Sequence, residues 1–405
     1  MKTFIGFLEA LELTLGHVAA VGTERLPLLA AAGRILAEDL HALVDSPSVS
    51  TSSKDGFAVV PEDLMAASRD KPVRLQLAGS LSAGDMHTVG LAPGQTVRVT
   101  TGALVPAGAQ AVISEEFCRT EGRTVCCFTT AEPGRNILQR GTDVRATEKV
   151  ACRGERLTPA RLGLIAAAGH GAALVHKAPR AAVIATGDEV IAPGRPLTPG
   201  QLYASNMVAI GAWLALLGIP FETAVIPDSF QAVRSAVLDR LPGTDVFITS
   251  GGAWGSEKDL VLRVAAELGW TGIYHRVRMG PGKPVGFGLL EGRPFFVLPG
   301  GPPSNEMAFL QLCLPALLKM TGAAPAVFPT VPARLNDRVT GERGWTEFIH
   351  ARLAESPAGL SVVPTRLSSR LKSMAEKQAL IVIPEDRDEI PAGETIDVQL
   401  LQSRA

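Results

Sequence analysis

The chain lacks the features that mark several large classes of protein. Only 5% of its residues are aromatic, and its 39 Lys and Arg residues nearly balance its 40 Asp and Glu residues. A nearly neutral chain has no strong overall field, so nucleic acid and other polyanionic partners are not predicted. A content of 46% hydrophobic residues nevertheless excludes a disordered chain.

Long apolar runs are missing too. The longest, Met207–Phe221, has fifteen residues and is broken by Gly211, Gly218 and Pro220. A membrane-spanning helix needs about 20 apolar residues, so this run predicts a buried helix and the sequence predicts no membrane segment. A secretory signal is not expected either, because Glu9 interrupts the apolar residues near the N-terminus.

Cysteine is scarce as well. The five cysteines are odd in number and lack the C-x2-C spacing of a zinc site, which favours reduced thiols in the cytoplasm. The chain also contains no P-loop, G-x-G-x-x-G, H-E-x-x-H or G-x-S-x-G pattern. Interpretations as an ATPase, a dinucleotide oxidoreductase or a zinc peptidase therefore lose support.

Glycine and proline, in contrast, are abundant, with 41 and 29 residues among 405. A chain of this length predicts two to four domains at roughly 150 residues each. Apolar spacing predicts helix over residues 1–45, and short β-rich runs between turns predict an all-β segment over 46–146. A capping pattern predicts a helix over 158–168, and strand-like runs return over 326–405 as a small β unit.

Residues 180–320 repeat one pattern four times: an apolar strand, a turn rich in Gly or Asp, and a helix. This alternation predicts an α/β fold with a doubly wound parallel sheet. The predicted strands cover 181–185, 224–226, 246–249 and 295–298, and the last predicted helix runs from Ser304 to Met320.

The turns after these strands carry the candidate site, because ligands of such sheets bind beyond the carboxyl ends of the strands. The turns Ser250–Gly252 and Pro299–Ser304 would let backbone N–H groups approach an anion at a helix N-terminus. Each turn alone is also explained by the positive φ that tight turns require of glycine. Their place on adjacent strand ends favours phosphate binding.

Charged side chains occupy the same region. Asp188, Glu189, Asp228 and Asp259 fall in strand-end loops, and Mg²⁺ prefers one or two carboxylates together with substrate oxygens. Helix capping is the alternative role for these acids. Lys283 is held between Pro and Gly residues, where it would present its ammonium to an oxyanion or lie solvated in a loop.

Further motifs join these residues in chain order: Ser53–Ala58, Thr101–Pro106, Gly134–Ile137, Thr186–Glu189 and Pro281–Pro284. Together they resemble the molybdopterin molybdenumtransferase family, the molybdenum insertases (MoeA) that include the E domain of gephyrin. The resemblance extends over most of the chain.

The resemblance implies a cytoplasmic, elongated homodimer of four-domain subunits. The domains would be a helical dimerisation domain from 1–45 and 147–178, an inserted β domain of 46–146, an adenylyltransferase-like, molybdopterin-binding α/β domain of 179–325 and a C-terminal β-barrel-like domain of 326–405. The active site would lie between the α/β domain of one subunit and the β domain of the other. A molybdopterin adenylyltransferase would be a further partner.

The implied reaction takes adenylylated molybdopterin and molybdate, cleaves the adenylyl phosphate in a Mg²⁺-dependent step, inserts molybdenum and releases AMP. Asp228 and Asp259 would hold the Mg²⁺, and Lys283 would hold the oxyanion. The implied catalytic residues are Asp55, Asp143, Glu189, Asp228 and Asp259. The implied substrate-binding residues are Thr101, Gly102, Ser250, Gly251, Gly252, Lys283, Pro284, Pro299, Gly300 and Ser304.

The chain departs from the family pattern at several blocks. Ala253–Lys258 replaces a Val-Ser-x-Gly-Asp block, and Gly301 replaces Asn. Trp345 and His350 stand at the ends of a segment that usually reads Arg-x-Glu-Phe-x-Arg, and 366–370 replaces a Gly-Ser-Gly-like block. Two alternatives to the insertase therefore stay open: a paralogue for tungstate or for a later step of cofactor maturation, and a non-catalytic molybdopterin-binding scaffold.

Overall fold

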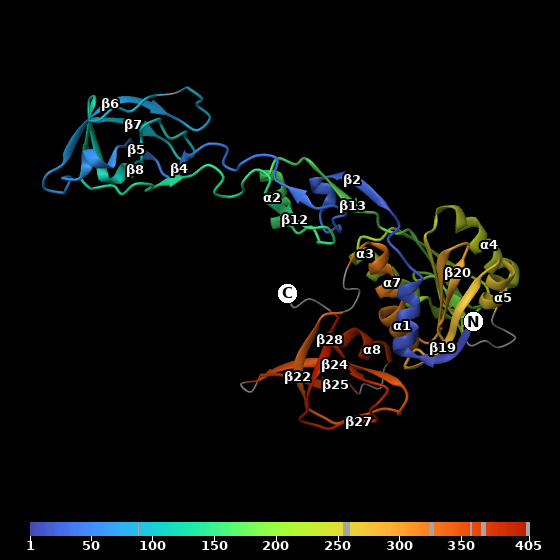
Figure 1. The fold of residues 1–405 in the computed structure, drawn as a ribbon. Coiled ribbons are helices and arrows are strands. Elements are labelled where there is room, and N and C mark those ends of the chain that lie inside the picture. The colour runs from blue at the N-terminus through green and yellow to red at the C-terminus, as the bar shows by residue number, and fades with distance from the viewer. Residues whose placement is uncertain (88, 254–259, 324–327, 357–358, 366–369, 402–405) are drawn as a thin grey trace. The chain divides into compact units, whose positions relative to one another are not determined.

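The computed structural model describes residues 1–87, 89–253, 260–323, 328–356, 359–365 and 370–401. It divides the chain into two compact units, one of Met1–Glu24 with His176–Ala405 and one of Arg25–Val175 (Figure 1). No helix among the described residues is long and apolar enough to span a membrane.

A parallel sheet lies at the centre of the first unit. Its strands follow the order β17 (Phe221–Ile226), β14 (Ala181–Thr186), β18 (Val246–Ser250) and β21 (Arg293–Leu298). Numbered along the chain, this order is 2-1-3-4, so the winding reverses between β14 and β18. The four predicted strands and their parallel pairing are confirmed.

Helices cover both faces of this sheet. Alternate residues of β14 enter two different cores, with Val183 in one and Ile184 in the other, because successive side chains of a strand point to opposite faces. In Figure 1, α4 and α5 lie on one side of the sheet and α1, α3 and α7 on the other. The helices are α1 (Phe7–Gly16), α3 (Ser205–Leu216), α4 (Phe230–Arg240), α5 (Leu260–Glu267), α6 (Pro302–Ala308) and α7 (Leu314–Met320).

The helix predicted from Ser304 to Met320 is confirmed and begins slightly earlier. It consists of α6, a π-helical turn over Phe309–Cys313, and α7. Pro302 is tolerated at its start because the first helical residues need no N–H partner within the helix. The sheet also continues through an antiparallel pair that the sequence did not predict, β20 (Gly286–Leu290) and β19 (Thr271–Gly280).

The prediction of helix over residues 1–45 is wrong outside α1 and a short 3-10 turn over Leu28–Ala31. The strand β1 (Lys2–Gly6) pairs in parallel with β19. The strand β2 (Thr23–Pro27) pairs with β13 (Ala172–His176), and β3 (Leu40–His41) pairs with β12 (Lys149–Ala151). In each case a distant strand supplies the backbone hydrogen bonds, and this tertiary pairing overrides the helical spacing of the apolar residues.

The C-terminal part of the first unit is a closed five-stranded barrel. This agrees with the small β unit that the sequence predicts for the tail. The barrel joins the sheet where β19 pairs with β24, at Met279 and Thr346. Its strands follow the order β24 (Thr346–Ser356), β25 (Gly359–Pro364), β22 (Thr330–Leu335), β28 (Thr395–Leu400) and β26 (Ala379–Ile383), and β26 closes on β24. One helix, α8 (Arg370–Glu376), lies between β25 and β26 in the chain, and β23 (Val339–Thr340) pairs with β27 (Glu389–Ile390).

The second unit contains the β-rich segment that the sequence predicted. A six-stranded sheet has the order β8 (Ala111–Ser114), β5 (Gly56–Val59), β7 (Gln95–Val99), β6 (Val73–Leu81), β10 (Thr124–Cys127) and β9 (Cys118–Glu121). A two-stranded ladder joins β4 (Thr51–Ser52) to β11 (Ile137–Leu138). The predicted helix is confirmed as α2 (Pro159–Ala167), and its cap Thr158 accepts a hydrogen bond from Arg161 N at 3.2 Å.

Candidate functional site

The carboxyl ends of the four parallel strands meet at one edge of the sheet. The register pairs Thr186 with Ile226, and Ser250 with both Ala185 and Leu298. The turns that follow lie at the point where the winding reverses, where ligands of doubly wound sheets bind. A cavity of about 620 Å³ opens there. Its lining includes Thr186, Glu189, Asn206, Asp228, Ser250, Gly251, Gly252, Gly300, Arg370 and Leu371.

The turn after β18 requires its two glycines. Gly251 has a φ of 109°, and a Cβ there would lie 2.7 Å from the carbonyl oxygen of Thr186. Gly252 has a φ of 68°, and a Cβ there would lie 2.8 Å from the side chain of Val261. A side chain at Gly251 would force a shift of the backbone, and one at Gly252 would displace the Val261 side chain, so this turn brings bare backbone to the cavity.

Two asparagines tie this turn to the turn after β21. The Asn206 amide donates to Ser250 Oγ at 3.2 Å and to the Gly300 carbonyl at 2.8 Å. The Asn305 amide donates to Ser250 Oγ at 3.1 Å and to the Pro299 carbonyl at 2.8 Å. Asn305 is buried at the start of α6, so its hydrogen bonds are shielded from water. The two glycine turns are thus held as one rigid element.

Carboxylates flank this element on the β14 and β17 ends. Thr186 Oγ1 donates to Asp228 Oδ1 at 2.9 Å, and the Asp228 backbone N–H donates to Asp188 Oδ1 at 2.9 Å. The next residue, Ser229, caps α4 by accepting from Ala232 N at 3.2 Å, which leaves the Asp228 side chain free of a capping role. Glu189 lines the same cavity.

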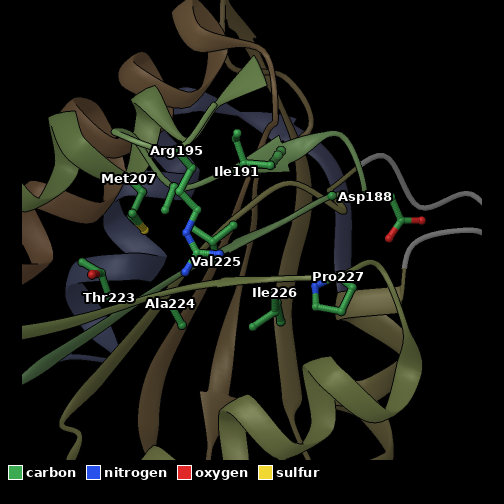
Figure 2. Close-up of a pocket in the computed structure, with 12 residues that line it drawn as sticks. Asp188, Ile191, Arg195, Met207, Thr223, Ala224, Val225, Ile226 and Pro227 are labelled. Atoms are coloured by element: carbon green, nitrogen blue, oxygen red, sulfur yellow. The ribbon is translucent and has the colours of Figure 1, made fainter. Parts of the chain in front are cut away.

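A second cavity of about 490 Å³ lies beside the edge strand β17. In Figure 2 the Arg195 side chain reaches from its loop toward β17, with its guanidinium beside Val225, while Asp188 points away from it. The short ladder β15 (Val190–Ile191) with β16 (Leu202–Tyr203) shapes this loop. The Tyr203 hydroxyl also donates to the Arg195 carbonyl at 2.8 Å.

Lys283 has surroundings that the sequence did not predict. Its ammonium lies 5.2 Å from the ring centroids of both Phe4 and Trp345, which themselves meet edge to face. Phe4 adopts a φ of 58°, a left-handed conformation that is unusual for a bulky residue. Lys283 and Pro284 are not among the described residues that line the 620 Å³ cavity.

The predicted residues of the second unit form a separate group. Asp55 Oδ1 accepts hydrogen bonds from the Thr101 N–H at 2.6 Å and from Thr101 Oγ1 at 3.0 Å. These hydrogen bonds, the backbone one first, hold the pKa of Asp55 below its ordinary value. Gly102 has a φ of 83° in the same turn. Asp143 donates its backbone N–H to the Ser46 carbonyl at 2.9 Å.

The structure thus brings part of the predicted site together. Glu189, Asp228, Ser250–Gly252 and Gly300 line one cavity, and the Pro299 carbonyl accepts the hydrogen bond from Asn305. Ser304 lies in the first turn of α6 and Asp259 lies outside the described residues.

Sequence reasoning missed two of the residues that build this cavity. Asn305, which supports the cavity from behind Ser250, was missed because it stands between the polar residues Ser304 and Glu306 and gives no distinct signal. Arg370 was missed because its place depends on how the barrel docks.

Three family models match successive parts of the chain. They are the MoeA N-terminal region (domain I and II) over residues 5–169, a probable molybdopterin binding domain over 182–319, and the MoeA C-terminal region (domain IV) over 332–401.

Relatives and solved structures match nearly the whole chain. Molybdopterin molybdenumtransferase 2 of Mycobacterium tuberculosis is 33% identical, with 92% of this chain and 94% of the relative covered. The molybdopterin molybdenumtransferase of a Nostoc species is 30% identical, with 94% and 88% covered. A crystal structure of the molybdopterin biosynthesis MoeA protein from Pyrococcus horikoshii has a TM-score of 0.83 at 30% identity, with 99% of this chain and 100% of that chain covered.

Proposed function

This chain belongs to the MoeA family of molybdopterin molybdenumtransferases, and from this premise we propose that it transfers molybdenum from molybdate to adenylylated molybdopterin with release of AMP. Relatives of about 30% identity over nearly the whole chain support a transferase of molybdenum cofactor biosynthesis. The observation that carries the proposal is the pair of glycine turns, joined by Asn206 and Asn305, beside the Asp228 carboxylate.

This arrangement suits the cleavage of a phosphate bond. Glycine turns let the backbone approach phosphate oxygens closely, and the dipole of the helix that begins at Pro302 favours negative charge beside the second turn. Donors that are already fixed before the substrate arrives need no reorganisation as charge develops in the transition state. We assign phosphate binding to Ser250, Gly251, Gly252 and Gly300, and the shaping of the same pocket to Glu189.

Mg²⁺ fits this donor set as an ion shared with the substrate. The hydrogen bond between Asp228 N and Asp188 Oδ1 holds two acidic residues close together. Within the described part of the chain, no group of three or more His, Cys, Asp or Glu residues could hold a metal ion by itself. One or two carboxylates with phosphate oxygens are a common set of ligands for Mg²⁺. We assign the ion to Asp228 and Asp259, where it would neutralise charge on the phosphate.

The predicted residues that lie in Arg25–Val175 are assigned to a partner subunit. We propose a homodimer in which Asp55, Thr101, Gly102 and Asp143 of one copy complete the cavity of the other. The Asp55–Thr101 hydrogen bonds support a preorganised carboxylate for this role, because they fix its position and keep it ionised.

The test is AMP release by the purified chain with adenylylated molybdopterin, molybdate and Mg²⁺. We expect turnover by the unaltered protein and a loss of about 100-fold in Asp228→Asn, because one charged group of the preorganised site is removed. Asp239→Asn is the matched control, since Asp239 is exposed on α4 and is not part of the lining of the cavity. If Asp228→Asn released AMP as fast as the unaltered protein, Asp228 would have no role in the reaction.

The same assay separates the alternatives. Competition between molybdate and tungstate at fixed pterin concentration identifies the metal that the chain handles. Binding of adenylylated molybdopterin without AMP release in the presence of either metal would instead identify a non-catalytic scaffold.

A further inference from the structure

One wall of the cavity comes from the C-terminal barrel. Helix α8 packs against α6, which begins beside the cavity. Arg370 and Leu371, the first two residues of α8, line the cavity together with Pro302 at the start of α6. The barrel therefore contributes side chains to a site that is otherwise built from strand ends.

Arg370 changes the charge of this cavity. Among the described residues of the lining, Arg370 is the one cation, while Glu189 and Asp228 are anions. Without Arg370 the charged side chains would repel an anionic substrate. A guanidinium presents several N–H donors in a planar fork that matches the oxygens of a tetrahedral oxyanion. Arg370 is exposed and, within the described residues, pairs with no carboxylate, so its donors are open to a ligand.

The position of Arg370 is set at the other end of α8. Lys377, directly after the helix, donates to Glu306 Oε1 on α6 at 2.6 Å and to the Met374 carbonyl at 2.7 Å. The Lys377 and Glu306 side chains are only 8% and 12% exposed. A helix of seven residues is not stable alone in water. This bridge therefore ties the end of α8 to α6 and helps to fix the position of Arg370 at the other end.

We propose that Arg370 pairs with a tetrahedral oxyanion in this cavity, either the phosphate of adenylylated molybdopterin or molybdate, and that the Glu306–Lys377 bridge positions it. This inference rests on the proposed function, since it names a further binding residue of the same site. The glycine turns supply neutral N–H donors, and Arg370 supplies the opposite charge that holds the anion against Glu189 and Asp228.

The test measures the Kd of each ligand separately by titration calorimetry of the full chain. Arg370→Gln is expected to raise the Kd of one ligand about tenfold, the effect of losing a charge-assisted hydrogen bond, and to leave the other unchanged. The ligand affected identifies the oxyanion. Arg370→Lys keeps the charge without the fork and should recover part of the affinity. Lys372→Gln, which removes a cation from an exposed site on the same helix, should bind as the unaltered protein does.

The outcomes separate the inference from the proposed function. Unchanged Kd values for both ligands in Arg370→Gln, or an equal rise in Lys372→Gln, would overturn the role of Arg370. Binding does not depend on turnover, so a lack of AMP release by the unaltered chain would refute the proposed function alone. For the bridge, Lys377→Gln should raise the same Kd at unchanged stoichiometry. If Lys377→Gln instead showed fewer binding sites at an unchanged Kd, part of the protein would be unfolded, and the bridge would have only a structural role.

Discussion

Replacing Lys377 by Met should destabilise the first unit strongly. The substitution removes the cation of a buried pair and keeps a side chain of similar length. It leaves the Glu306 carboxylate, which is 12% exposed, without its closest charge partner. His350 lies 3.4 Å from the other oxygen of Glu306, and its side chain is only 11% exposed. Water therefore has little access to the uncompensated charge of Glu306.

The size of the effect follows from the geometry. At 2.6 Å and an effective dielectric constant near 20, the attraction in the pair is about 6 kcal/mol before desolvation is subtracted. Breaking a buried pair on one side usually costs about 3–5 kcal/mol. For a unit of this size that loss corresponds to a decrease in Tm of about 6–20 °C.

Tryptophan fluorescence during urea unfolding measures the loss of stability in the first unit. All four tryptophans, including Trp213, Trp270 and Trp345, belong to the first unit, so the signal does not report on the second. Lys2→Met is the matched control, because it breaks an exposed Lys–Glu pair of similar length, 2.7 Å, in the same unit. It should cost less than about 1 kcal/mol.

The double variant Lys377→Met with Glu306→Leu decides whether the charges are responsible. Replacing both ions by apolar residues of similar size is often nearly neutral, so the double variant should recover most of the lost stability. A single variant that costs less than about 1 kcal/mol would refute the reasoning. So would a double variant as unstable as the single one, because the loss would then come from packing.

Two other perturbations test the glycine turn and the Asp55 carboxylate. Gly251→Ala should lower the unfolding free energy by about 1–3 kcal/mol, because its Cβ would meet the Thr186 carbonyl at a positive φ, whereas Gly301→Ala has open space and should cost about 0.5 kcal/mol or less in thermal unfolding. The lowered pKa of Asp55 means that its stabilising contacts are fully present above the ordinary Asp range near 4 and are lost as the pH falls through the lowered value. A carbon-13 NMR titration should give an Asp55 midpoint below that range; a midpoint at or above it would contradict the role of the Thr101 hydrogen bonds.

The sheet and its strand-end site could be predicted from the sequence because their signals are local. Four apolar strands each end in a polar or glycine turn, and topology brings those ends to one edge whatever the surrounding packing. Asp228 and Ser250 are therefore found from the chain alone, and the structure places both in the same cavity.

The rest of the site depends on contacts between distant segments. Lys283 is surrounded by Phe4 and Trp345, and Phe4 lies in a strand whose spacing indicated a helix. Arg370 reaches the cavity because α8 packs on α6, where Lys377 pairs with Glu306. Periodicity and turn patterns do not encode such docking, since each contact joins segments tens to hundreds of residues apart.

The balanced charge of the chain is consistent with a site that captures anions at short range. A globally basic protein would attract every polyanion, whereas this chain has a formal net charge of −1. Inside the cavity, N–H groups of the glycine turns carry no net charge, and Arg370 offsets only one of the two carboxylates of the described lining. The affinity proposed for an anion therefore comes from close hydrogen bonds to Arg370 and to the glycine turns rather than from a net positive charge of the cavity. In the proposed function, Mg²⁺ held by Asp228 would add a second positive group beside the phosphate.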